Sequence, residues 1–271
     1  MAVPDIQLGK YTIPQVGLGV WQVESVEQFK TAFSTAIKAG YRHFDTAQIY
    51  KNEQMLGDAW VASGVDRKDL FLTTKVWLNN FTSGRLVKSV DGSLEKLQTD
   101  YIDLLLLHFP VTGLRKNAWK TLEELKVTGK VRNIGVSNYT VTHLEGMKKY
   151  ATELPSINQV ELHVFLQQPE LVNYCRDNGI ILEAYSPLAH GKDLSNPIVQ
   201  KIADKYSKSY AQIMLRWCIE EGMVILPKSV TPSRIKENIE LFDFQLDSAD
   251  LEQLVGCERN LRTCWSPVHV P

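Results

Sequence analysis

The chain of 271 residues has few cysteines, no long apolar run and no excess of charge of either sign. Cys175, Cys218, Cys257 and Cys264 include no CxxC pair, so we interpret them as reduced thiols that mostly pack in the core. The 31 acidic and 30 basic side chains leave a net charge of −1. Without a field of one sign or a basic tail, nucleic acid is not an expected partner.

Membrane and export signals are also lacking. The longest apolar runs, such as IDLLLLHF, fall far short of the ~20 residues that cross a bilayer. The opening MAVPDIQLGKYTIPQ has no charged region followed by an apolar one, as a signal peptide would. We therefore expect a cytoplasmic protein with no membrane partner. The histidines form no HExxH or His-x-His motif, so no metal site is predicted.

No linker, low-complexity tract or break in composition divides the chain, and residues 1–271 are predicted to form a single domain. Helical patterns separate short β-rich runs. Ser25 with Gln28, and Ser209 with Gln212, have capping-box spacing, and Thr231 precedes a proline that can begin a helix. The β-rich runs are residues 16–21, 41–45, 70–77, 102–108, 131–137, 157–162, 180–186 and 223–227.

Eight apolar strands with helices between them indicate an α/β fold, the (β/α)8 TIM barrel. The alternative is a doubly wound open sheet, which favours a GxGxxG motif near its first strand. The first run reads GLGVWQ, with Gln22 where the third glycine would stand. The barrel is therefore the favoured fold.

Polar side chains stand at the ends of most predicted strands, where a barrel carries its active site, at the C-terminal face. Taken singly, each residue is more often a cap, a paired lysine or a satisfied buried histidine. Their coincidence at equivalent strand ends indicates one shared site. These residues are Asp45 with nearby Tyr50, Lys75, His108, Ser137, Asn138, Gln159, Tyr185, Ser186, Lys228 and Ser229.

Asp45, Tyr50 and Lys75 together suggest acid–base chemistry. A phenol has a pKa of ~10 and is a weak acid near neutrality, but a neighbouring ammonium lowers that pKa. A carboxylate beside the ammonium keeps it charged away from water. His108 could orient an oxygen atom next to the phenol. This set of groups suits the transfer of a proton to an oxygen that is becoming an alkoxide.

The segments GYRHFDTAQIYKNE, TTKVW, LLHFP, IGVSN and LPKS resemble the aldo-keto reductase superfamily. The similarity covers nearly the whole chain and is greatest to the bacterial 2,5-diketo-D-gluconate reductase (B-like) and methylglyoxal reductase group. The resemblance implies a tetrad of Asp45, Tyr50, Lys75 and His108. Tyr50 would donate the proton, Lys75 paired with Asp45 would tune it, and His108 would orient the carbonyl. It also implies a monomer.

A phenol supplies no hydride, so reduction needs a cofactor. PKSVTPSR sets cationic residues at the start of a helix, which is either an anion site or a solvated basic helix start. The resemblance favours the anion site and implies NADPH or NADP+. It would place Lys228, Ser229 and Arg234 on the 2′-phosphate, and Glu237 and Asn238 near the adenine. Tyr185 would stack on the nicotinamide, and Ser137, Asn138 and Gln159 would hold its carboxamide. Ser186 and Leu188 would belong to the same cofactor site.

Trp21, Trp77 and Phe109 follow predicted strands and could either pack the top of the barrel or line a pocket. The resemblance favours substrate binding, although Phe109 stands where a tryptophan is common. The stretch after Pro110 is short, which predicts an open pocket. The segment NLRTCWSPVHVP could fold over the rim and bring Arg262 to a substrate carboxylate.

Three functions are compatible with these residues. The first is NADPH-dependent reduction of small carbonyl compounds: aldehydes, α-dicarbonyls such as methylglyoxal, or keto-sugar acids. The second is a Schiff-base lyase that uses Lys75 as nucleophile, which requires a neutral lysine that Asp45 disfavours. The third is a non-catalytic NADP(H)-sensing regulatory subunit, which an intact tetrad disfavours. We expect the reductase.

Overall fold

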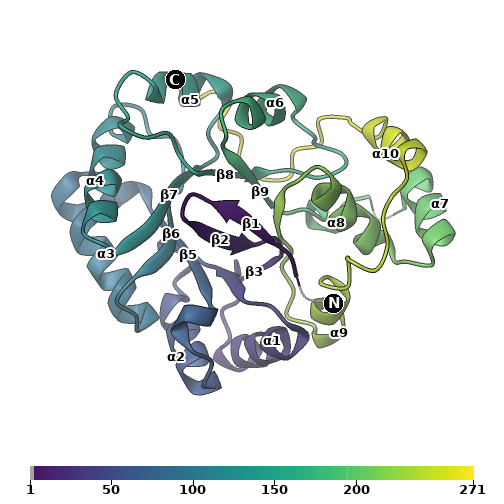
Figure 1. Cartoon of the computed structure of the whole chain (residues 1–271), viewed down its shortest axis with the longest axis horizontal. Coiled ribbons are helices and arrows are strands. Elements are labelled where there is room, and N and C mark those ends of the chain that lie inside the picture. The colour runs from purple at the N-terminus through teal and green to yellow at the C-terminus, as the bar shows by residue number, and fades with distance from the viewer. Residues whose placement is uncertain (1–2, 194) are drawn as a thin grey trace.

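The computed structural model describes residues 3–193 and 195–271. Eight parallel strands form one sheet in the order β10-β9-β8-β7-β6-β5-β4-β3. The sheet curls around a central axis (Figure 1), and single parallel bridges from Val16 to Ile225 and from Gly19 to Lys228 join its two edge strands. The predicted (β/α)8 barrel is confirmed, and the open-sheet alternative is wrong.

Each β-rich run of the sequence forms one strand of the barrel, with ends within a few residues of those predicted. The barrel strands are three to seven residues long. They are β3 (Gly17–Gly19), β4 (His43–Asp45), β5 (Phe71–Val76), β6 (Ile102–Leu107), β7 (Val131–Ser137), β8 (Ile157–Glu161), β9 (Ile181–Tyr185) and β10 (Val224–Leu226).

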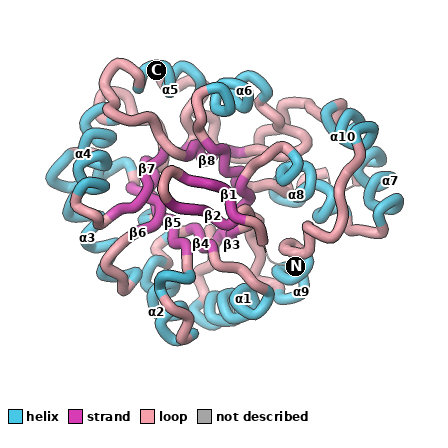
Figure 2. Tube along the Cα trace, viewed as in Figure 1, coloured by secondary structure: helices cyan, strands magenta, loops and turns pink. Residues whose placement is uncertain are grey.

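Helices form a ring around the strands (Figure 2) and cover their outer faces. Two of them, α7 and α8, lie between β9 and β10, and α10 follows the last strand. The α-helices are α1 (Val26–Ala39), α2 (Glu53–Ser63), α3 (Ser83–Leu97), α4 (Arg115–Val127), α5 (Val141–Met147), α6 (Pro169–Asp177), α7 (Pro197–Tyr206), α8 (Tyr210–Glu220), α9 (Pro232–Glu237) and α10 (Ser248–Val255). None of these described helices has the length and apolarity needed to cross a membrane.

The predicted helix starts are correct in position, but their capping hydrogen bonds differ from those predicted. Ser209 and Gln212 form the full reciprocal capping box at α8. Ser25 accepts a hydrogen bond from the Gln28 backbone, but the return bond from the Gln28 side chain is absent among the contacts of the described residues. Thr231 is the N-cap of α9 and precedes its proline, yet its side chain makes no cap bond.

A hairpin that the sequence analysis missed covers the N-terminal end of the barrel. It consists of β1 (Asp5–Leu8) and β2 (Tyr11–Pro14), which pair antiparallel and lie across the barrel in Figure 1. Leu8 and Ile13 are fully buried and pack into a cluster with Phe71, Leu104 and other side chains from the barrel interior. Two strands of four residues need this tertiary contact to be stable, so local pattern did not reveal them.

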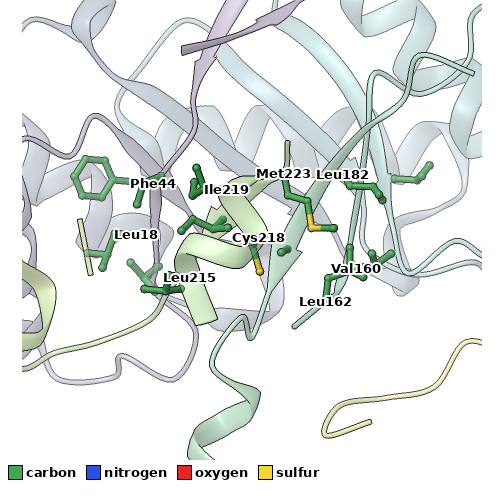
Figure 3. Close-up of a cluster of buried hydrophobic side chains, with 14 of the residues drawn as sticks. Leu18, Phe44, Val160, Leu162, Leu182, Leu215, Cys218, Ile219 and Met223 are labelled. Atoms are coloured by element: carbon green, nitrogen blue, oxygen red, sulfur yellow. The ribbon is translucent and has the colours of Figure 1, made fainter. Parts of the chain in front are cut away.

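The larger core lies between the strands and the helical ring. Figure 3 shows part of it, where Leu18 and Phe44 from the strands lie near Leu215 and Ile219 of α8, and Leu182 lies near Met223. Cys175, Cys218 and Cys257 are buried free thiols, as expected of packing residues. Burial on the outer face and in the interior explains why the strand sequences read as almost continuous apolar runs.

Inside the barrel the side chains change from apolar to polar toward the carboxyl ends of the strands. Alternate residues of a strand share one face, so Phe71 and Lys75 of β5 both point inward, as do Ile157, Gln159 and Glu161 of β8. Phe71 and Ile157 pack beneath the hairpin, whereas Lys75 and Gln159 bind Asp45. The chemistry is thereby concentrated at the C-terminal face.

Candidate active site

A cavity of about 650 Å³ opens at the carboxyl ends of the barrel strands. This volume falls in the range of pockets that bind small molecules and cofactors. The structure brings most of the predicted site residues together there. Those that line the cavity are Trp21, Asp45, Tyr50, His108, Ser137, Asn138, Gln159, Tyr185, Ser186, Leu188 and Lys228.

Lys75 lies directly behind the cavity wall and is completely buried. Its Nζ is 2.6 Å from Asp45 Oδ1, 2.9 Å from the Thr46 carbonyl oxygen and 3.5 Å from Tyr50 Oη. The ammonium therefore has acceptors in three directions, which a buried charge requires. Asp45 at the end of β4 and Lys75 near the end of β5 meet because those strands are neighbours in the barrel.

The contact with Asp45 favours the charged form of Lys75. Burial favours the neutral amine, but attraction to Asp45, to Tyr50 and to Glu183 outweighs it and raises the pKa of Lys75. Burial also raises the pKa of Asp45, against the opposing effects of Lys75 and of the Gln159 amide. With 2.6 Å between nitrogen and oxygen, the shared charge interaction stabilises both ions. A lysine held protonated in this way does not suit a Schiff-base nucleophile.

The pKa of Tyr50 corrects one expectation from the sequence. Lys75 does lower this pKa, but burial raises it by more, and Asp45 adds to the rise, so the net pKa lies above the usual 10. The sequence predicts the Lys75 ammonium near Tyr50, but it does not show how deeply the Tyr50 phenol is buried. At neutral pH Tyr50 therefore carries its proton.

His108 is a neutral imidazole in this environment. Burial and the positive charge of Lys75 hold its pKa well below the usual value. Its ring packs edge-on against Tyr50 at 5.7 Å and against Trp77 at 5.1 Å between centroids. Its single N–H can donate to an oxygen atom placed beside the Tyr50 hydroxyl.

A second buried acid, which the sequence analysis did not select, lies beneath these groups. Glu183 of β9 is fully buried, and its Oε2 accepts a hydrogen bond of 2.7 Å from Gln159 Nε2. The same nitrogen donates to Asp45 Oδ2 at 2.8 Å. His43 Nε2 lies 3.6 Å from Glu183 Oε1. The alternation of side chains along a strand could have indicated Glu183, because it stands two residues before Tyr185 and therefore lies on the same face of the strand.

The ends of β7 and β9 are joined by a chain of hydrogen bonds. Tyr185 Oη donates to Asn138 Oδ1 at 2.7 Å, and Asn138 Nδ2 donates to Ser137 Oγ at 3.0 Å and to the His108 carbonyl at 3.1 Å. Asn138 and Ser186 have φ angles of 65° and 48°, in the left-handed region that residues other than glycine seldom adopt. Both residues line the cavity, and their backbone turns the chain there.

The remaining predicted residues lie outside the cavity lining. Ser229 is buried next to Lys228, and Arg234, Glu237 and Asn238 belong to α9 or follow it directly, with Arg234 exposed. Trp77 packs against His108 and Trp265. Phe109 follows His108 but is not among the residues that line the cavity.

The segment after α10 folds over the rim, as its sequence led us to expect. Thr263, Cys264 and Trp265 line the cavity. Arg262 does not; its guanidinium lies 3.7 Å from the buried Glu161 carboxylate and 3.2 Å from Gln168 Oε1. The rim segment therefore carries side chains to the cavity that the strand ends do not supply.

Comparison with known proteins identifies the family of this site. The model of the aldo/keto reductase family matches residues 6–259. The chain belongs to the aldo/keto reductase family. A glyoxal reductase of Bacillus subtilis (strain 168) is 44% identical over 255 residues, which cover 94% of this chain and 92% of the relative. Methylglyoxal reductase DkgA of Escherichia coli O157:H7 is 42% identical over 254 residues, 92% of this chain and 91% of the relative.

Solved structures agree with the family assignment. The crystal structure of a Bombyx mori aldo-keto reductase in complex with NADP has a TM-score of 0.91 and 35% sequence identity, and the match covers 97% of this chain and 95% of that chain. This aldo/keto reductase is accordingly an oxidoreductase enzyme, and carbonyl reduction is the chemistry that its relatives' names describe.

Proposed function

We propose that this aldo/keto reductase uses NADPH to reduce small aldehydes and α-dicarbonyls, such as glyoxal and methylglyoxal, to alcohols. Keto-sugar acids, including 2,5-diketo-D-gluconate, belong to the same proposed substrate class. The observation that carries the proposal is the buried contact of Lys75 with Asp45 and Tyr50, next to neutral His108, on the wall of the cavity. The names of the two bacterial relatives support the substrate class.

The chain's residues fit a dinucleotide cofactor, whose nicotinamide would supply the hydride. Gln159 uses its amide nitrogen on Asp45 and Glu183, which leaves its side-chain oxygen to accept a hydrogen bond in the cavity. Ser137, Asn138 and Tyr185 stand on the same wall, and Ser186 and Leu188 lead outward from it. Lys228 and Arg234 would attract a 2′-phosphate, with Ser229, Glu237 and Asn238 nearby.

Tyr50 would donate the proton. Its raised pKa keeps the phenol protonated at neutral pH, and an alkoxide is a much stronger base than a phenolate, so the transfer runs downhill. The Lys75 ammonium stabilises the phenolate that remains. The N–H of neutral His108 would hold the carbonyl oxygen beside Tyr50 Oη.

The proposed substrate region includes aromatic side chains. Trp21 lines the opening and is 41% exposed, and Trp77 packs behind His108. We include Phe109 in the proposed substrate region because it directly follows His108 in the chain. Aromatic walls favour apolar and planar carbonyl groups without fixing one compound.

The test is oxidation of NADPH by the purified enzyme with glyoxal, methylglyoxal and a keto-sugar acid. We expect turnover with at least one of them, and loss of about a hundredfold or more in kcat for Tyr50→Phe with unchanged NADPH binding. Tyr150→Phe is the matched control, because its buried hydroxyl has no hydrogen-bond partner among the described residues. NADPH binding without any turnover would instead support the regulatory function, and an active Tyr50→Phe enzyme would refute Tyr50 as the donor.

A further inference from the structure

We propose that Glu161 is a positioning residue that holds the rim segment, residues 262–265, against the cavity and thereby sets selectivity for bulky carbonyl substrates. The inference rests on the proposed function, since selectivity is measured with NADPH and carbonyl compounds. Glu161 is the last residue of β8, and the rim segment lies about a hundred positions further along the chain.

The Glu161 carboxylate is fully buried and binds the rim segment through both of its oxygen atoms. Oε1 accepts a hydrogen bond of 2.7 Å from the Thr263 backbone N–H and another from the Thr263 hydroxyl. Oε2 accepts a bond of 3.1 Å from the Cys264 N–H and lies 3.7 Å from Arg262 Nη1. Three consecutive residues of the rim are therefore held by one side chain.

The carboxylate is ionised where it lies. Burial would raise the pKa of Glu161, but hydrogen bonds from His163, Thr263 and Cys264 outweigh it and lower the pKa to about 2. Charged acceptors form stronger hydrogen bonds than neutral ones, and the nearby Arg262 adds attraction. Since the side chain issues from a barrel strand, the attachment point is rigid.

The anchored segment forms one wall of the cavity. Thr263, Cys264 and Trp265 line it, and the Trp265 ring lies 6.0 Å from the Trp77 ring between centroids. Trp77 in turn packs on His108 at 5.1 Å. Trp265 is 67% exposed, so its own packing holds it weakly and its place depends on the backbone that Glu161 binds.

A second attachment holds the far end of the same stretch. His143 Nε2 lies 2.7 Å from the Val270 carbonyl oxygen, and Arg115 donates to the Pro271 carbonyl at 2.7 Å. Before the rim segment, the Leu261 N–H donates to the Phe165 carbonyl at 2.9 Å. Between these two attachments, Glu161 holds the backbone of Thr263 and Cys264 next to the cavity. Without Glu161, the backbone N–H groups of Thr263 and Cys264 would lose their acceptor, while the attachments of Leu261 and Val270 remained.

Substrate size determines which compounds contact the wall formed by the rim segment. A small dicarbonyl needs only the oxygen site between Tyr50 and His108. An aromatic aldehyde extends outward and packs against Trp265. We therefore expect Glu161 to affect KM for the aromatic substrate, because the lost contact is binding that the ground state and the transition state share.

The experiment compares Glu161→Gln, Trp265→Ala and the double variant, with methylglyoxal and para-nitrobenzaldehyde as substrates. Glutamine keeps the volume but points an NH2 donor at the backbone N–H groups that Glu161 binds. We expect KM for the aromatic aldehyde to rise about five- to tenfold in each single variant, with kcat within about twofold, and to rise by more than KM for methylglyoxal. The double variant should resemble the single ones, because both remove the same contact.

Glu258→Gln is the matched control. The Glu258 carboxylate also accepts hydrogen bonds from backbone N–H groups, those of Gln167 and Asn260, but Glu258 does not line the cavity. Its KM values should match those of the wild type. An independent readout is trypsin cleavage after Arg262, which we expect to be faster in Glu161→Gln than in Glu258→Gln.

Each outcome decides a separate point. If the wild type reduces neither compound and also fails with glyoxal and a keto-sugar acid, the proposed function fails, and cleavage after Arg262 still tests the anchor. If the wild type is active but Glu161→Gln keeps its KM for the aromatic aldehyde, the positioning role is refuted. Equal KM increases for both substrates, or additive effects in the double variant, would show a general structural role and also refute it.

Discussion

Gln159 donates a hydrogen bond of 2.7 Å to Glu183, an acid that lies one layer beneath the Asp45–Lys75 pair. The two residues face each other because they are in register on β8 and β9. Since Gln159 also donates to Asp45, one amide connects the acid–base group at the surface of the cavity with a carboxyl group deep in the barrel. The ionisation of Glu183 is therefore part of the electrostatics of the site.

Glu183 should make the free energy of unfolding depend on pH. Burial and the charge of Asp45 raise its folded pKa from 4.5 to about 8, so the folded protein keeps a proton that the unfolded chain releases. The stability from this proton is complete below pH 4.5 and is lost as pH rises toward 8, at about 1.4 kcal/mol per pKa unit. Urea unfolding of the wild type and of Glu183→Gln across this range measures the difference.

The comparison of the two proteins isolates Glu183 from its neighbours. His43, whose folded pKa is lowered to about 3 by burial, remains in both, as do Asp45 and Lys75. We expect the stability of the variant relative to the wild type to increase with pH. Parallel curves for the two proteins would show that Glu183 does not hold the proton.

Lys75 should be as important for stability as for chemistry. Replacement by Met leaves the buried Asp45 carboxylate without its cation, which costs about 3–5 kcal/mol in the free energy of unfolding. Chemical denaturation measures this cost. The double variant Asp45→Asn with Lys75→Met removes both charges and should recover a large part of it. Equal loss in the single and double variants would mean that packing of the lysine stem, and not its charge, explains the effect.

Arg234 should discriminate between the two nicotinamide cofactors. If it binds the 2′-phosphate, Arg234→Ala raises KM for NADPH by about ten- to a hundredfold, because a hydrogen bond to a charged group is lost. KM for NADH, which has no such phosphate, stays the same. Lys236→Ala on the same helix is the matched control and should alter neither value. Equal efficiency of the wild type with both cofactors would contradict the assignment.

Much of the fold and of the site followed from local sequence pattern. Near-continuous apolar runs between amphipathic segments predicted all eight barrel strands, because strands buried on both faces need such runs. Residues at the strand ends, including Asp45, Lys75, His108 and Gln159, were predicted to converge because a barrel turns all carboxyl ends to one face. These inferences need only chain periodicity and a known topology.

Contacts between segments that are far apart in the sequence determine the remaining features of the fold and of the site. The hairpin formed by β1 and β2, the Glu183 layer and the binding of Glu161 to Thr263 join positions whose separation along the chain reveals no relation. The same holds for Tyr50, whose pKa rises because burial outweighs the ammonium beside it. Periodicity reports which way a side chain points, whereas the free energy of a charge depends on how deeply it is buried and on what it meets there, and both arise only when the chain packs.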